Sequence, residues 1–219
     1  MQTTITVTGR AETRVEPELA AVTLSVGGSG EARDDVIART GAAHERLLAA
    51  VRELEASGAL DSWSAPQLRV WSHRPWNADG RQLPLVHEAT ADVEVVFRDF
   101  DRLGEWLGTA SGSPELTVGG IDWRVTEATR AGARESAQRA AVADAVAKAG
   151  VYASALGLGT PVAIEVTDHG RLGPAPSPMP KAMMMRAAAD VSGAAVTEFA
   201  PQDLVIEASV DARFVAEPA

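Results

Sequence analysis

Four histidines are the side chains of this sequence best suited to acid–base or metal chemistry. His73 and His87 fall in two neighbouring predicted strands, where they can face each other beside Glu88. A zinc site needs three or four convergent ligands, so ordinary hairpin side chains are the alternative to a metal site. His44 falls on the apolar face of a predicted helix, either as a general base or as a histidine packed in the core or an interface. His169 lies in a loop, where we expect a turn.

The motifs of common catalytic machineries are missing from the sequence. It contains no cysteine, which excludes disulfides, thiolate catalysis and cysteine-bound zinc. It has no G-x-S-x-G, P-loop or dinucleotide motif, and residues 27–30 (GGSG) lack the Lys-Ser/Thr of a phosphate cradle. We expect a tight turn at these glycines. We therefore predict a protein that is not an enzyme, and we nominate no catalytic residue, no cofactor and no metal site.

Two tryptophans are candidates for contact with a partner. Trp71 and Trp76 flank the tip of a predicted hairpin. An exposed aromatic pair at such a tip would anchor an interface. The alternative is that the tip folds back and buries both side chains.

A methionine triplet is the second candidate. Met183, Met184 and Met185 stand in a long Met/Ala/Pro-rich stretch without sustained periodicity, which we predict to be a loop or insertion over 169–201. Methionine adapts to partner grooves and apolar ligands, and its thioether also binds Cu(I). The alternative is a loop that packs on its own domain or on a sister subunit.

The charge balance bears on the class of partner. The net charge is −10, and the sequence contains only two lysines, Lys148 and Lys181. Nucleic-acid binding needs clustered cationic side chains, so we exclude nucleic acid as a partner. No apolar run approaches the roughly 20 residues of a membrane-spanning helix. The first residues, MQTTITVTGR, show no signal peptide, so we expect a cytoplasmic protein.

The hydrophobic pattern predicts the elements that must position these side chains. Alternation predicts two strands within 5–27, separated by Glu16-Pro17-Glu18, and further strands at 67–73, 86–98, 116–126, 162–167 and 204–214. Spacings of three and four predict helices over 31–58, 99–109 and 128–156. Gly58 and Gly157 suit the ends of the two long helices.

The same spacing predicts which face of each long helix is buried. For the first helix the apolar face consists of Ile37, Thr40, His44, Leu47, Val51 and Leu54. For the second it consists of Val142, Val146, Ala149, Ala153 and Leu156. We predict an α+β fold, a mostly antiparallel sheet with two long helices and one short helix packed on it, in the order β-β-α-β-β-α-β-α-β-β. We expect a single domain over 1–219.

The order of four stretches resembles the SIMPL-domain family, a bacterial family of unknown function. They are the two opening strands around the Glu16-Pro17-Glu18 turn, VEVVFRDFDRLGEWL at 93–107, the alanine-rich 134–159 with its closing ALGLG, and the last strand at 204–214. Together they span nearly the whole chain. Two features depart from the family. Pro201-Gln202-Asp203 replaces the usual Pro-Gly pair, and the usual export signal is not seen.

The resemblance implies an α+β fold and assembly into a homo-oligomer, because at least one relative forms a hollow, ring-like assembly. It implies no reaction. We therefore predict a non-enzymatic, self-associating protein with a structural or stress-related role. The alternative is a binding module whose 169–201 loop engages a peptide or an apolar ligand.

Overall fold

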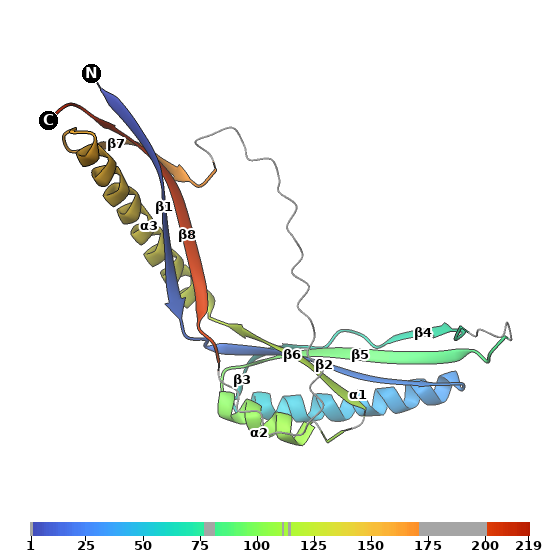
Figure 1. Ribbon diagram of the computed structural model, residues 1–219. Helices are drawn as coiled ribbons and strands as arrows, with labels where there is room; N and C mark the ends of the chain where they lie inside the picture. The colour runs from blue at the N-terminus through green and yellow to red at the C-terminus, as the bar shows by residue number, and fades with distance from the viewer. Residues whose placement is uncertain (1, 77–81, 111, 114, 171–200) are drawn as a thin grey trace. The chain divides into compact units, whose positions relative to one another are not determined.

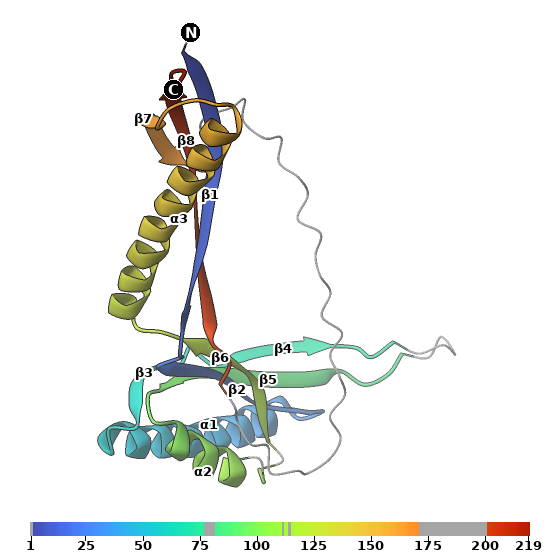
Figure 2. The same ribbon diagram turned by 60° about the vertical axis from the view of Figure 1, so that its left-hand side comes forward.

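The alternating stretches form antiparallel strands in the computed structural model of the protein, and the periodic stretches form helices (Figures 1 and 2). The structure describes residues 2–76, 82–110, 112–113, 115–170 and 201–219. In this part of the chain, three helices accompany antiparallel sheets, which confirms the α+β class. No helix of the described residues is both long and apolar enough to cross a membrane.

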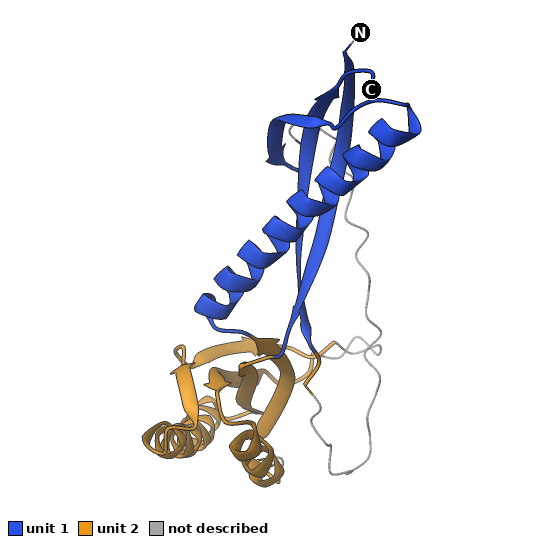
Figure 3. Cartoon of the chain, turned by 90° about the vertical axis from the view of Figure 1, so that its left-hand side faces the viewer, with its two compact units in different colours: residues 1–16, 125–195, 203–219 blue, residues 17–124, 196–202 orange. Residues whose placement is uncertain are grey.

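The chain divides into two compact units, which Figure 3 colours separately. Unit 1 comprises the described residues of 1–16, 125–195 and 203–219, and unit 2 those of 17–124 and 196–202. Each unit has its own cluster of buried apolar side chains. The expectation of a single domain over 1–219 stays a prediction.

The sheet of unit 1 has the order β1-β8-β7, and both neighbouring pairs are antiparallel. The strands are β1 (Thr3–Val15), β7 (Val162–Asp168) and β8 (Leu204–Ala216). β1 pairs with β8 along its whole length and ends at Val15, directly before the predicted break at Glu16-Pro17-Glu18. Alternation places Ile5, Val7 and Phe214 on the buried face.

Helix α3 (Glu127–Ala155) covers the buried face of β1 and β8. The Thr126 side chain accepts a hydrogen bond from the Thr129 amide at its start, and Gly157 adopts a φ of 67° just after its end, as predicted. The predicted buried face is partly wrong. The buried residues of the helix are all alanines, spaced four apart: Ala133, Ala137, Ala141, Ala145, Ala149 and Ala153. The larger Val142, Val146 and Leu156 are exposed.

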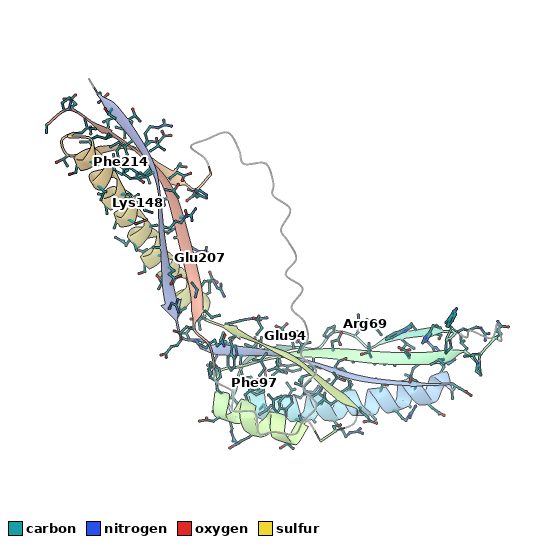
Figure 4. All side chains as sticks on the ribbon, in the orientation of Figure 1. Arg69, Glu94, Phe97, Lys148, Glu207 and Phe214 are labelled. Atoms are coloured by element: carbon teal, nitrogen blue, oxygen red, sulfur yellow. The ribbon has the colours of Figure 1, made fainter. Side chains whose placement is uncertain are left out.

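Unit 2 is a sheet of order β3-β5-β2-β6, with β4 also paired to β5. The strands are β2 (Leu19–Gly30), β3 (Leu60–Ser64), β4 (Arg69–His73), β5 (Val86–Phe97) and β6 (Leu116–Arg124). Helices α1 (Arg33–Ala56) and α2 (Phe100–Ala110) lie on the same side of it (Figures 1 and 3). Phe97 points to the helical side, whereas Glu94 and Arg69 point to the other (Figure 4).

Two predictions for unit 2 are wrong. Strand β3 was missed, because its five residues are too short to show a clear alternation. The GGSG stretch is not a turn but the end of β2, where Gly27, Gly28 and Gly30 pair with β5. A Cβ at Gly30 would lie 3.1 Å from Cγ2 of Val36 on α1. The glycines therefore let α1 approach β2 closely. The sequence pattern, which was interpreted as a turn, does not show this contact.

Helix α1 buries much of its predicted face. Thr40, Leu47 and Val51 are buried as expected, whereas Val36, Ala43 and Leu48 replace the rest of the predicted set. Gly58 follows the helix with a φ of 78°, as predicted.

The contact of α3 with β1 gives the first testable prediction. A Cβ at Gly9 would overlap the carbonyl oxygen of Ala141 and lie 2.8 Å from Cβ of Ala145. We expect Gly9→Ala to lower the free energy of unfolding by about 1–3 kcal/mol or more, because α3 must move away from the sheet. The measurement is urea unfolding followed by circular dichroism.

Gly150→Ala is the matched control, since Gly150 lies within α3 and a Cβ there meets no atom within 4 Å. It should raise the free energy of unfolding by about 0.5–1 kcal/mol, the helix preference of alanine over glycine. Equal effects of the two substitutions would contradict the close packing at Gly9.

Candidate self-association surfaces

The most exposed apolar side chains of unit 1 include those of β7. Val162, Ile164 and Val166 are 62%, 56% and 50% exposed. Within the described residues, β7 pairs only with β8, and the buried cluster of unit 1 includes no β7 side chain. The sequence explains this position, because Gly157 and Pro161 end α3 and direct the chain back along the outer edge of the sheet. β7 therefore presents an apolar strand that no helix covers in the described part of the chain.

The second apolar group of unit 1 lies on α3. Val142 and Val146 are 38% and 50% exposed. They are one turn apart, so their side chains lie along the same flank of the helix. Asp144 and Lys148 contact β1 from the opposite flank: the amide of Arg10 donates to Asp144 Oδ2 at 2.8 Å, and Lys148 Nζ donates to the Thr8 carbonyl at 3.0 Å.

This arrangement fixes the direction of the two valines. Residues two apart in a helix differ in direction by about 200°. Since Asp144 and Lys148 face β1, Val142 and Val146 face the side on which β8 and β7 follow. Three further apolar side chains on or just after the last turns of α3 are exposed, namely Val151, Tyr152 and Leu156. Val166 lies opposite the buried Ala212, on the side of the sheet that α3 covers, whereas Val162 lies opposite Val215, on the other side. We call β7, whose edge exposes both faces, together with Val142 and Val146 the β7–α3 surface.

In unit 2, the two candidate tryptophans are on the surface. Trp76 is 87% exposed, so the alternative in which the tip buries it does not hold. Trp71 is 44% exposed and lies opposite Glu88 in the β4–β5 pair. It shares the helix-free face of the sheet with the ion pair between Arg69 and Asp92. Their role in an interface stays a prediction.

The methionine candidates Met183, Met184 and Met185 lie outside the described residues, as does most of the predicted 169–201 loop. His169 and Gly170 are described, and they form the predicted turn.

The four histidines do not converge. The β4–β5 register places Ser72, not His73, opposite His87, so His73 and His87 lie on opposite faces of the sheet and the predicted facing pair is wrong. His73 contacts Glu88 at 3.3 Å, and His87 Nδ1 lies 2.6 Å from Ser72 Oγ. His44 lies on α1, and its Nε2 is buried without a hydrogen-bond partner among the described residues. In the described part of the chain, no three His, Asp or Glu side chains are placed to bind a metal.

Unit 1 contains one buried carboxylate that the sequence analysis missed. Asp211 on β8 is 8% exposed and accepts hydrogen bonds from Thr8 Oγ1 at 2.8 Å and from the Gly170 amide at 2.7 Å. His169 Nδ1 lies 2.9 Å from its Oδ1. A carboxylate only accepts, so this contact places a proton on Nδ1. These bonds, first that of His169 and then those of Gly170 and Thr8, hold the pKa of Asp211 below its usual value.

The Asp211 cluster joins β1, β8 and the end of β7, which marks it as a structural contact. It lies beside an open groove of about 640 Å³ whose lining includes Arg10, Glu207 and Ser209. The Ser209 hydroxyl donates to the Gly9 carbonyl at 3.3 Å, so its proton is engaged with the main chain. In the sequence, Asp211 is one polar residue in an alternating strand, and only the register that pairs it with Thr8 reveals the cluster.

Comparison with known families gives one match. A family model described as SIMPL, protein of unknown function (DUF541), matches residues 5–214. The match covers nearly the whole chain, including both units. Among curated proteins, none matches significantly.

The Asp211 cluster predicts an acid-sensitive contribution to stability. Because the folded pKa of Asp211 lies below that of an unfolded aspartate, about 3.9, its contribution is complete above that pH. It is lost as the pH falls through the lower folded pKa. Asp211→Asn should lower the free energy of unfolding by about 1–3 kcal/mol at pH 7 and flatten its decline below pH 4.

Urea unfolding from pH 7 to pH 2 measures both effects. Asp168→Asn is the control, because Asp168 is an exposed aspartate close by on β7. An unchanged pH profile in Asp211→Asn would show that the cluster does not hold the strands together.

Proposed function

The chain belongs to the SIMPL family, and from that premise we propose that it is a non-enzymatic protein that assembles with copies of itself through the β7–α3 surface. The observation that carries this proposal is strand β7, which no helix covers in the described part of the chain and whose three large apolar side chains are at least half exposed. Monomeric proteins rarely leave an apolar edge strand of this kind exposed. A structural or stress-related role follows as part of the same proposal.

The free energies of burial favour a contact that includes both β7 and the two valines of α3. Fully burying a valine or isoleucine side chain contributes about 1.5–3 kcal/mol, so completing the burial of a half-exposed one contributes about 1 kcal/mol. The three β7 side chains of two copies would together contribute about 6 kcal/mol, against an association cost of roughly 4–15 kcal/mol. Adding Val142 and Val146 raises the gain to about 10 kcal/mol. The gain from β7 alone lies near the lower end of that cost, and the combined surface raises it toward the middle of the range, so the contact needs both elements.

The edge of β7 also offers main-chain hydrogen-bonding groups to a second copy. The strand has one irregularity, at Ile164, where the register with β8 shifts by a residue. Bulges are a common protection of edge strands against continuous pairing. We therefore propose that apolar packing of side chains, rather than an extended intermolecular sheet, provides most of the contact.

The proposed contact uses few charges. The β7 carboxylate Glu165 is paired with Arg213 at 2.9 Å within the same unit. A second copy approaching β7 therefore meets a paired charge at Glu165 and one further carboxylate, Asp168, at the end of the strand. The few charges on β7 favour contact between identical copies, which otherwise repel each other through the net charge of −10.

Light scattering coupled to size-exclusion chromatography tests the proposal. We expect the intact chain at about 100 µM to elute as a particle of several times 22.9 kDa, whose mass falls on dilution toward about 1 µM. Val166→Lys and Val146→Glu should each shift the particle to smaller species, because a charge would be buried in the contact.

The control variants introduce the same charged side chains outside the β7–α3 surface. Val205→Lys replaces a side chain of similar exposure (46%) on β8, and Ala147→Glu places a charge on the outer side of α3. Both should leave the mass unchanged. A 22.9 kDa monomer at every concentration would contradict self-association. A particle that resists both surface variants but is lost in Trp76→Ser would assign the contact to the hairpin instead.

A further inference from the structure

Unit 2 contains an apolar cavity of about 190 Å³ between α1 and α2. Val26 and Leu116, which pair directly across β2 and β6, line it from the sheet. Leu47 of α1 and Trp106 of α2 line it from the helices. Val26 and Leu47 are 2% and 7% exposed, so the cavity reaches the buried core of the unit.

The cavity exists because the helices carry small side chains where they border it. Ala43 and Ala50, one turn before and just under one turn after Leu47, line it from α1, and Ala110 lines it from the end of α2. An enclosed protein cavity of about 150 Å³ lined by apolar side chains binds benzene. The cavity here has a volume of about 190 Å³ and is partly open to solvent, so it accommodates one six-membered ring with a small substituent at the opening.

An ion pair stands at the border of the cavity. Arg46 Nη2 lies 2.6 Å from Glu115 Oε2, and both residues line the cavity. Their side chains are 67% and 40% exposed, so solvent and solutes reach them. The guanidinium offers further N–H donors, and the carboxylate offers further acceptor positions. A hydroxyl group, which both donates and accepts, matches this pair, whereas a charged group would meet one partner of like charge.

We propose that this cavity binds a neutral, single-ring aromatic compound with a hydroxyl substituent. The ring lies beside Trp106, where aromatic rings prefer offset or edge contacts. The hydroxyl lies at the Arg46–Glu115 pair. This site belongs wholly to unit 2 and does not depend on the self-association proposed above.

The test uses 4-fluorophenol and fluorobenzene as probes, observed by fluorine NMR against the intact protein. We expect saturable binding of 4-fluorophenol with a Kd of about 0.1–1 mM, a value typical of a ligand with eight heavy atoms. Fluorobenzene should bind about tenfold more weakly, because it lacks the hydroxyl. No saturation by 4-fluorophenol up to about 10 mM, well above that Kd, would overturn the proposal.

A matched pair of variants locates the binding. Ala50→Leu extends a side chain into the cavity and should abolish binding of both probes. Ala49→Leu adds the same atoms at the neighbouring exposed position of α1 and should leave binding unchanged. Equal binding by the two variants would place the ligand elsewhere and overturn the proposal.

A third variant tests the ion pair, and it also tests the proposed binding if Ala50→Leu does not fold. Arg46→Met keeps the length of an exposed side chain and removes its donors. It should weaken 4-fluorophenol binding by about tenfold and leave that of fluorobenzene unchanged. An equal effect on both probes, or none on either, would overturn the assignment of the hydroxyl to this pair.

Discussion

The close contact between α3 and the β1–β8 pair is the constraint on which unit 1 depends. Gly9 leaves room for the main chain of α3 at Ala141, and each buried residue of the helix is an alanine. Once the helix is this near, a larger side chain cannot face the sheet. The valines of α3 must then lie on its flank, and they are exposed there. The exposed apolar surface of unit 1 is thus a consequence of its closest packing.

This constraint also explains which strand of the sheet no helix covers in the described part of the chain. A single helix that contacts β1 and β8 so closely does not extend over a third strand, and β7 pairs beyond them. Asp211 then ties the end of β7 to β1 and β8 through Thr8, His169 and Gly170. The strand is held in place by hydrogen bonds, while its side chains contribute nothing to the buried cluster within the described residues.

The sequence predicted the elements better than their faces. Strong alternation located β5 and β8, and helical spacing located α2 with its buried Leu103 and Leu107. It misplaced the buried face of α3, because an analysis of periodicity gives weight to large apolar residues. A helix in close contact with a sheet buries small ones. The glycines of β2 were predicted to form a turn, because the sequence alone does not distinguish a glycine required for close packing from a glycine required for a turn.

The candidate sites likewise divide into those that local sequence indicated and those that depend on tertiary structure. The two tryptophans were candidates because of their place beside a turn, with burial by the tip as the alternative, and Trp76 is exposed. The β7–α3 surface, the Asp211 cluster and the cavity beside Trp106 depend on residues that strand register and helix packing bring together from different helices and strands. Alternation within one strand does not reveal which strand lies beside it, so no local pattern could have located them.

The use of alanine connects the fold with the proposed assembly. Apolar burial contributes roughly in proportion to the area removed from water, and an alanine removes much less area than a valine or a leucine. The helix side of the unit 1 core consists of alanines, so this core gains modestly from each residue that it buries. The apolar area that remains available lies on β7 and on the flank of α3. Contact with a second copy would bury that area, and it would thereby stabilise unit 1 together with the assembly.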